Sequence, residues 1–263
     1  MGKYWAVFKI TWQNSLEYRV EFLTHMIRGI ITLVILIFIW SAIFKQTPNF
    51  GNYTFSSMLT YLVMVQFLHF ATRGNIGRLT ADEIKEGKLS IYLLKPISYL
   101  KMWFSSFWAD RFFEFFIRFL IIFTFLFLLP NYFKLPLPGR FFLFLLFLVI
   151  SLLFNFLWNI FQATFAFWVT DIHLFTTTLG LTVGFLAGEL IPIDIMPNFL
   201  KTLSLFLPFQ YTLYFPIKIY QGALSGGEIV RGVFVFLSWI AVLYFLMTHL
   251  WQRGLRRYEA IGQ

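Results

Sequence analysis

The stretch that decides the fold covers residues 140–168 and reads RFFLFLLFLVISLLFNFLWNIFQATFAFW. About 20 apolar residues allow an α-helix to cross the roughly 30 Å hydrocarbon core of a bilayer. This run exceeds that length, and Arg140 at its start is its only charged residue. A transmembrane β-strand would instead alternate apolar and polar residues over about ten positions. The stretch therefore predicts a membrane-spanning helix.

Comparable apolar runs recur on both sides of this stretch. We expect spanning helices over residues 25–44, 55–72, 107–129, 140–168, 175–191 and 231–250. The third carries charged residues, and the fifth is short and rich in glycine. The predicted fold is an all-α membrane protein with six transmembrane helices in a single domain over residues 1–263.

The composition of the chain supports this fold class. Hydrophobic residues make up 59% of the 263 residues, charged residues make up 13%, and the mean hydropathy is +0.74. An average soluble domain has about 25% charged residues. The chain therefore lacks the polar surface of a soluble enzyme or regulator, and it is too hydrophobic to be intrinsically disordered. It has no cysteine, which excludes disulfides and thiolate metal sites.

The basic residues predict the orientation of the chain. With the N-terminus inside, the cytoplasmic segments hold most of the lysines and arginines, namely Lys3, Lys9, Arg19, Arg28, Arg73, Arg78, Lys85, Lys88, Lys95, Lys101, Arg253, Arg256 and Arg257. An excess of Lys and Arg marks cytoplasmic loops. We therefore expect a multi-pass protein of the inner or plasma membrane with both termini in the cytoplasm. The net charge of +9 then reflects orientation, and no nucleic-acid binding is expected.

The N-terminal segment, residues 1–24, has the pattern of an amphipathic helix. Trp5, Phe8 and Trp12 recur at steps of three or four, with Lys9 and Gln13 on the other face. Such a helix lies along the membrane surface. It is either a simple anchor or also borders a cytoplasmic partner, and both interpretations stay open.

The longest predicted cytoplasmic connection covers residues 73–106. Thr80 followed by Glu83 forms a capping-box pattern, so we expect a short helix to start at Thr80. Gly87 suits the position after its end, with Lys85 and Lys88 near the negative end of the helix dipole. An ordinary loop between spans is the alternative.

Two segments carry a resemblance to a known family. Residues 83–98 read EIKEGKLSIYLLKPIS, and residues 188–216 read GELIPIDIMPNFLKTLSLFLPFQYTLYFP. Both resemble ABC-2 type exporter permeases, the first in particular the subgroup in which two different permeases often pair. The resemblance implies a six-span permease that joins a second permease chain, slightly more often a different one, and a cytoplasmic ABC ATPase dimer. It also implies export, with ATP and Mg²⁺ on the ATPase and no cofactor on this chain.

The same resemblance assigns roles to individual residues. It implies that Thr80–Lys88 is a coupling helix that docks on the ATPase, and we expect Glu83, Glu86 and Lys88 to make charged contacts there. It implies that the fifth span lies near the interface between permeases. Residues 192–228 are interrupted by prolines, so we expect them to form re-entrant or interfacial helices. The resemblance implies that this segment caps the path on the outer face.

A pentapeptide at Leu224–Glu228 reads LSGGE and resembles the signature of ABC ATPases. The chain has no G-x-x-x-x-G-K-[ST] loop to hold phosphates. We therefore interpret Ser225 and Glu228 as a capping box that begins the sixth span. ATP hydrolysis is expected on a separate chain.

Polar residues inside the spans form the remaining candidate sites. In the third span Arg111, Glu114 and Arg118 share one helical face, where ion pairing is expected ahead of a substrate or proton path. In the fourth span a polar stripe repeats at steps of three and four and consists of Ser151, Asn155, Asn159 and Gln162. These residues either join helices or line a conduit, and the first is the commoner case.

The fifth span repeats glycine at Gly180, Gly184 and Gly188, which allows another helix to approach closely. Glu189 follows, and either a local salt bridge or contact with substrate would explain a carboxylate there. The glycines, Glu189 and the polar stripe of the fourth span are the expected permease interface and transport path.

An intramembrane enzyme is the distant alternative. The histidines are scattered at His25, His69, His173 and His249, and the sequence contains no H-E-x-x-H pair and no metal motif. We therefore expect a non-enzymatic permease that moves an amphipathic or hydrophobic drug, lipid or peptide outward. A permease that exports polysaccharide or glycolipid is the alternative.

Overall fold

The computed structural model describes residues 2–17, 19–72, 76–128, 136–169 and 171–258, and most of them are α-helical. In chain order the α-helices are α1 (Gly2–Glu17), α2 (Arg19–Gln46), α3 (Phe55–Thr72), α4 (Ile76–Lys85), α5 (Leu89–Leu93), α6 (Tyr99–Leu128), α7 (Pro138–Thr164), α8 (Ile172–Leu186), α9 (Asn198–Phe206), α10 (Tyr214–Gln221) and α11 (Gly226–Arg257). Shorter elements are the 3₁₀ helices η1 (Phe165–Phe167), η2 (Ile193–Ile195) and η3 (Pro208–Thr212), and an antiparallel hairpin of β1 (Asn49–Phe50) and β2 (Tyr53–Thr54).

The longest helices correspond to predicted spans. In the described part of the chain, three segments are long and apolar enough to cross a membrane: Ile27–Gln46, Pro138–Phe167 and Gly226–Arg257. Two shorter apolar helices, Phe55–His69 and Ile172–Leu186, match the second and fifth predicted spans. The third predicted span falls within α6, where the side chains of residues 116–128 lie outside the described ones. The all-α membrane fold is thus supported, and the count of six spans stays a prediction.

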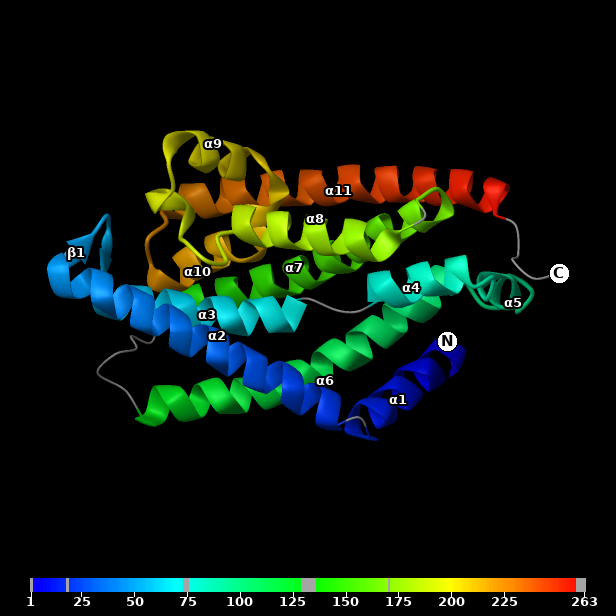
Figure 1. Ribbon diagram of the computed structural model, residues 1–263, viewed down its shortest axis with the longest axis horizontal. Coiled ribbons are helices and arrows are strands. Elements are labelled where there is room, and N and C mark those ends of the chain that lie inside the picture. Colours follow the sequence, from blue (N-terminus) through cyan, green and yellow to red (C-terminus); the bar gives the residue numbers. More distant parts are fainter. Residues whose placement is uncertain (1, 18, 73–75, 129–135, 170, 259–263) are drawn as a thin grey trace.

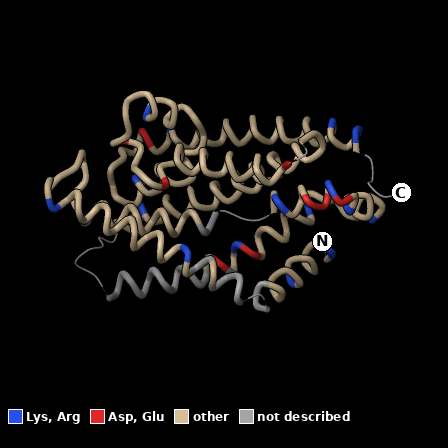
Figure 2. The backbone as a smooth tube through the Cα atoms, in the orientation of Figure 1, with Lys and Arg blue, Asp and Glu red and all other residues tan. Residues whose placement is uncertain are grey.

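The long helices run side by side, and the short elements gather at the two ends of the bundle (Figure 1). One end holds α4, α5, the beginning of α1 and the end of α11. The other end holds the β-hairpin, α9 and α10. Figure 2 shows that most charged residues lie toward these ends, with long uncharged stretches in α7 and α11 between them. This distribution fits a bilayer around the middle of the bundle.

The core between α7 and α11 is built from stacked aromatic rings. Phe236 of α11 lies 5.4 Å from Phe154 of α7 and 5.2 Å from Tyr211 of η3, measured between ring centroids. At Gly232 an added Cβ would lie 2.1 Å from the Phe215 ring of α10, so only glycine allows this approach. Aromatic pairs at these distances add to the free energy gained by burial. They hold α10 and η3, which belong to the predicted re-entrant segment, against the long helices.

The N-terminal helix differs from its predicted extent. A helix was expected over residues 3–23 within the segment 1–24, but α1 ends at Glu17 and α2 already begins at Arg19. The apolar run of the first span therefore belongs to a helix that starts earlier than predicted. The side chains of residues 15–23 lie outside the described ones.

Helix α8 is shorter than the predicted fifth span, because it ends at Leu186 rather than at residue 191. Gly188 has a left-handed backbone with φ of +88°, and the Glu189 N–H donates to the Gly184 carbonyl at 3.0 Å. A glycine in this conformation ends a helix at little steric expense. With 15 residues α8 is about 22 Å long at 1.5 Å per residue, so it ends before it could cross the hydrocarbon core.

Candidate functional site

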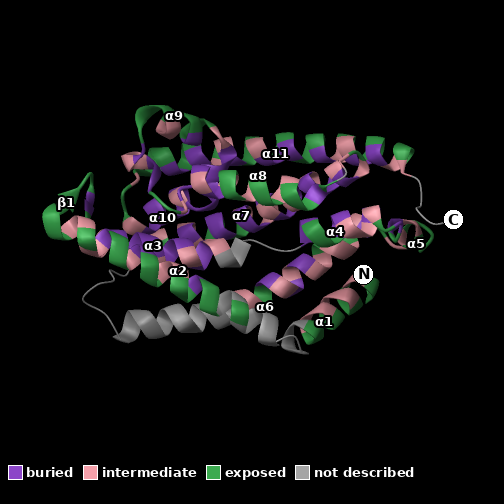
Figure 3. Cartoon of the chain, viewed as in Figure 1, coloured by how far each residue is buried: buried purple, intermediate pink, exposed green. Residues whose placement is uncertain are grey.

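The predicted start of the helix in the 73–106 connection was wrong. Helix α4 begins at Ile76, and Thr80 lies fully buried in its middle, so Thr80 and Glu83 form no capping box. The buried residues of α4 are Ile76, Gly77, Thr80, Ala81 and Ile84, which repeat at helical spacing. Figure 3 shows buried and exposed residues on opposite sides of α4. Tertiary packing of this face, rather than a local cap, therefore determines where the short helix forms.

The predicted end of the helix is confirmed. The last residue of α4 is Lys85, and Gly87 has a left-handed φ of +76°. The Glu86 N–H donates to the Asp82 carbonyl at 2.9 Å, which extends the helical bonding pattern by one residue. Glycine is the residue that adopts this conformation most readily. The chain can therefore reverse at Gly87 and continue directly into α5.

Helix α4 lies directly against α7. A Cβ added at Gly77 would lie 2.8 Å from the Asn159 backbone carbonyl oxygen and 3.0 Å from the Asn159 side-chain oxygen. Real Cβ atoms do not approach a backbone oxygen this closely, so the contact requires glycine. The crossing of the two helices is thus fixed at one point by Gly77 and Asn159.

Helix α4 also contacts the segment that leads into α8. The Asp82 carboxylate lies 3.0 Å from His173 Nε2 in the first turn of α8. The Lys85 ammonium donates to the Val169 carbonyl oxygen, just before that helix. Both contacts join residues more than 80 positions apart in the sequence. They connect α4 to α8 by polar side chains rather than by apolar packing alone.

Glu83, expected to face a partner, faces inward. Its carboxylate accepts a hydrogen bond from the Tyr99 hydroxyl at the start of α6. The Tyr99 ring stacks on Trp251 of α11 with 5.5 Å between centroids. Burial, together with the hydrogen bond to Glu83, raises the pKa of the Tyr99 hydroxyl, so it stays protonated and donates. Glu83 is therefore engaged within the chain.

The exposed side of this region is a surface that we call the α4–α5 tip, made of Leu79, Glu86, Lys88, Ile91 and Leu94. The apolar members are well exposed, Leu94 most of all at 88%. Glu86 and Lys88 pair at 2.5 Å with half-exposed side chains, and the carboxylate of Glu86 raises the pKa of Lys88. The tip thus combines exposed leucines with a charged pair on an element anchored from behind. Of the expected coupling residues, Glu86 and Lys88 belong to it, while Thr80, Glu83 and Lys85 contact the chain itself.

The polar stripe of α7 faces other parts of the same chain. The Asn155 amide donates to the Ser151 carbonyl and the Asn159 amide donates to the Asn155 carbonyl, each at 2.8 Å. The Ser151 hydroxyl donates to the Tyr211 carbonyl of η3, and Gln162 is buried. The stripe therefore lies at contacts of α7 with η3 and α4. This placement favours a role in joining helices over a role in lining a conduit.

The three glycines of the fifth predicted span do not share one helix. Gly188 lies beyond the end of α8, and its carbonyl accepts a hydrogen bond from Tyr61 of α3 at 2.6 Å. Gly184 is buried, whereas beyond the backbone of α8 no described atom lies within 4 Å of a Cβ added at Gly180. The helical stripe is therefore limited to Gly180 and Gly184, because the left-handed turn at Gly188 ends the helix.

Glu189 lies beside a histidine. Its carboxylate is 3.3 Å from His69 Nε2 of α3, and both side chains are mostly buried, at 23% and 18% exposed. The sequence placed Glu189 at the outer end of a span and His69 near the inner boundary. That separation was wrong, because α8 ends at Leu186 and the Glu189 side chain just beyond it meets His69. His69 provides the local partner that was expected for Glu189.

The ion pair expected in the third span is present in part. Arg111 binds Glu114 through two hydrogen bonds of 2.9 and 3.1 Å, and Arg111 is only 7% exposed. A bidentate arginine–carboxylate pair of this kind is the strong form of the interaction. The side chain of Arg118 lies outside the described residues.

An ion pair that the sequence did not predict lies at the end of the bundle with the β-hairpin. The Lys218 ammonium of α10 donates to the Asp194 carboxylate of η2 at 2.7 Å, and the Tyr53 hydroxyl of β2 donates to the other carboxylate oxygen at 3.0 Å. Lys218 also lies 4.4 Å from the centre of the Tyr53 ring. These three residues, which we call the Asp194 cluster, join the hairpin to the re-entrant segment. Asp194 and Lys218 are each isolated polar residues in apolar surroundings, and this was the only sign in the sequence.

The LSGGE pentapeptide has the predicted structural role. Ser225 is the N-cap of α11, and Ser225 and Glu228 form a reciprocal capping box. In the described part of the chain, no group of three or more His, Asp or Glu residues is arranged to hold a metal ion.

Comparison with known proteins agrees with this architecture. Residues 30–262 match a family model whose description is ABC-2 family transporter protein. The matched range includes the α4–α5 tip, the Asp194 cluster and the described helices from most of α2 to α11, whereas α1 lies before it. The search of curated proteins gives no match.

Proposed function

This chain belongs to the ABC-2 family of transporter proteins and is a membrane permease of an ABC transporter, and we propose that it works as an exporter driven by separate cytoplasmic ATPase chains. ATP and Mg²⁺ would bind on those chains, since this sequence has no phosphate-binding loop. The predicted positive-inside orientation puts both termini and the α4–α5 tip on the ATPase side.

The observation that carries this proposal is the α4–α5 tip. Leu79 in α4, Ile91 in α5 and Leu94 just after α5 expose large apolar side chains, and the Glu86–Lys88 pair lies in the turn between the two helices, at an end of the bundle rich in charged residues. Exposed apolar patches rimmed by polar residues mark protein–protein interaction sites. Glu83 and Lys85 hold the back of this element to the rest of the chain. The tip is thus suited to receive a rigid partner and to pass its movement on.

The contacts of α4 indicate where such a movement would go. The close contact at Gly77 and Asn159 and the pair of Asp82 with His173 favour transmission into α7 and α8. Displacement of α4 by an ATPase would therefore act on the fourth and fifth predicted spans.

A second permease would complete the transport path, and α8 offers a surface for it. Beyond the backbone of α8 itself, no described atom lies within 4 Å of a Cβ added at Gly180, and Leu181 beside it is 72% exposed. A small residue on an open helical face allows a second helix to pack closely. The apolar and aromatic spans fit a cargo that is amphipathic or hydrophobic, such as a drug, lipid or peptide.

The docking role of the α4–α5 tip can be tested by purification of tagged variants from native membranes. Leu94→Asp should abolish co-purification of a soluble ATPase, because an acidic group replaces the most exposed leucine of the tip. Leu137→Asp is the matched control, since Leu137 is also well exposed, at 69%, and precedes α7 at the other end of the bundle. Retention of the ATPase by the Leu94 variant would refute the docking site, and its loss from both variants would indicate a general folding defect.

The permease contact is tested by Gly180→Leu. The bulky side chain should separate α8 from a second permease and reduce the dimeric fraction in cross-linking, without loss of the folded monomer. Gly139→Leu serves as a control, since it adds the same side chain at an open glycine in the first turn of α7. Wild-type cross-linking in the Gly180 variant would remove α8 from the interface.

A further inference from the structure

Helix α1 is fastened to α6 by polar contacts along its length. The Ser105 hydroxyl donates to the Tyr4 carbonyl at 2.6 Å, and the Thr11 hydroxyl donates to Ser106 at 3.2 Å. The Lys3 ammonium donates to the Pro96 carbonyl just before α6. These contacts hold α1 in a defined position on α6. The spaces left between the two helices are therefore a feature of the fold rather than of a loosely attached helix.

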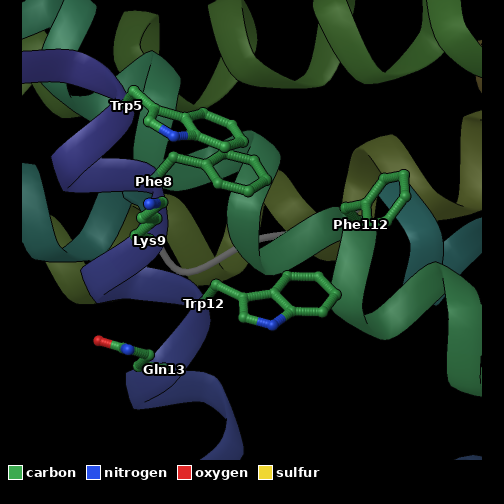
Figure 4. Close-up of a pocket in the computed structure, with 6 residues that line it drawn as sticks. All are labelled: Trp5, Phe8, Lys9, Trp12, Gln13 and Phe112. Carbon is green, nitrogen blue, oxygen red and sulfur yellow. The ribbon is translucent and has the colours of Figure 1, made fainter. Parts of the chain in front are cut away.

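Two adjoining hollows lie between α1 and α6 on either side of Trp5 and Phe8, which line both of them. Their volumes are about 410 and 530 Å³, in the range of ligand pockets. Figure 4 shows the rings of Trp5, Phe8 and Trp12 extending from α1 toward the side where Phe112 lies, and Lys9 and Gln13 complete the lining of this hollow. Trp5 and Phe8 stack at 5.0 Å, and Trp12 lies 5.7 Å from Phe112. We call the two hollows together the α1–α6 groove.

Positive charge borders this apolar groove on both sides. Lys9 lines one hollow and Lys101 lines the other, and both side chains are exposed. No carboxylate lines either hollow, and neither lysine forms an ion pair within the described part of the chain. Lys9 lies over the Trp5 ring at 5.9 Å. The groove therefore offers aromatic walls to a hydrocarbon chain and two uncompensated cations to an anionic group.

We propose that the α1–α6 groove binds an anionic glycerophospholipid of the leaflet on which α1 lies, with its acyl chain against Trp5, Phe8 and Trp12 and its phosphate near Lys9 and Lys101. An amphipathic helix with tryptophan on one face and lysine at its polar border lies at the boundary between headgroups and acyl chains. The anionic lipids of such a leaflet are the complementary charge that is available there. This lipid site depends on the chain lying in a membrane and does not depend on the direction of transport.

The lipid also explains a physical feature of the groove. Trp5 is 58% exposed, and without a bound molecule its ring would contact headgroups and water. A bound acyl chain removes this ring from water, and the headgroup satisfies the lysines at the same time. The occupant would thus seal α1 onto α6 and hold the N-terminal helix at the membrane surface.

The test uses the full chain in nanodiscs of phosphatidylcholine that contain brominated phosphatidylglycerol or, separately, brominated phosphatidylcholine. Bromine on an acyl chain quenches a tryptophan that it touches. The chain has nine tryptophans, so the signal of the groove is the quenching lost in Trp5→Phe/Trp12→Phe. This signal should show a binding preference for phosphatidylglycerol of about 25-fold, since each of the two lysines near an anionic headgroup contributes about fivefold.

The charge variants separate the groove from the general charge of the protein. Lys9→Gln/Lys101→Gln should abolish the preference, and Lys9→Arg/Lys101→Arg should keep it. Lys45→Gln/Lys201→Gln is the matched control, since it removes the same charge away from the groove. Equal quenching by both lipids in the wild type, a preference that survives in Lys9→Gln/Lys101→Gln, or an equal loss in the control would each overturn the proposal. An unchanged thermal unfolding midpoint in the Gln variants establishes that they are folded.

Discussion

The Asp194 cluster allows a prediction about stability that depends on burial rather than on distance. Lys218 and Asp194 pair at 2.7 Å with side chains only 9% and 14% exposed. Lys218→Met keeps the apolar stem of the side chain and removes its charge. Asp194 is then left with the Tyr53 hydroxyl as its remaining hydrogen-bond donor in this cluster. Removal of one partner of a buried pair destabilises by about 3–5 kcal/mol, because an uncompensated charge stays buried.

The double variant tests whether the buried charge is the cause. Asp194→Asn/Lys218→Met has no buried charge, and the asparagine can still accept from Tyr53. We therefore expect it to regain most of the stability lost in Lys218→Met. The assay is unfolding of the purified chain in mild detergent, followed by tryptophan fluorescence with heat or denaturant. Additive losses for the two single changes, with no recovery in the double variant, would refute the reasoning.

Lys88→Met provides the matched comparison. Its pair with Glu86 is shorter, at 2.5 Å, but the two side chains are 60% and 53% exposed. Exposed pairs contribute little to stability because water screens them. We expect the unfolding midpoint of Lys88→Met to stay close to that of the wild type. A loss as large as that of Lys218→Met would show that the solvent exposure of a pair does not determine its contribution here.

Two further predictions concern the contacts of α4. Gly77→Ala should destabilise the folded chain by about 1–3 kcal/mol, because the added methyl group overpacks against the Asn159 carbonyl. Gly139→Ala is the control in the same unfolding assay. It should be neutral or slightly stabilising, because the space around its Cβ is open. His173→Ala removes the partner of Asp82. We expect the ATPase to stay bound and the amount transported per ATP hydrolysed, measured in proteoliposomes, to fall. An unchanged ratio of transport to ATP hydrolysis would show that this contact does not transmit movement from α4 to α8.

Some parts of this structure follow directly from local sequence. Helices α7 and α11 were predictable because their apolar runs are long enough to span a bilayer without any tertiary information. The capping box of Ser225 and Glu228 was predictable because its two partners are three residues apart. Gly87 was predictable as a helix end because its backbone freedom is intrinsic to glycine.

Other parts depend on contacts that no local pattern encodes. The same capping-box rule failed at Thr80, because the face of α4 that includes Gly77 and Thr80 packs into the chain and extends the helix backward. The partner of Asp194 lies 24 residues away in Lys218, and its hydrogen-bond donor Tyr53 lies 141 residues away. Distances of this kind are set by the packing of helices, so the pairs become visible only in the folded chain.

Helix α8 is short, and long-range contacts hold it at its first turn and just beyond its last turn. At its first turn His173 meets Asp82 of α4, and beyond its last turn Gly188 and Glu189 meet Tyr61 and His69 of α3. If α4 shifts the first turn of α8 and α8 stays straight, the shift reaches the other end of the helix. A longer helix would carry Glu189 past His69 and break this connection. The early helix end at Gly188, which the sequence analysis missed, therefore allows α8 to link the α4–α5 tip to the interior of the bundle.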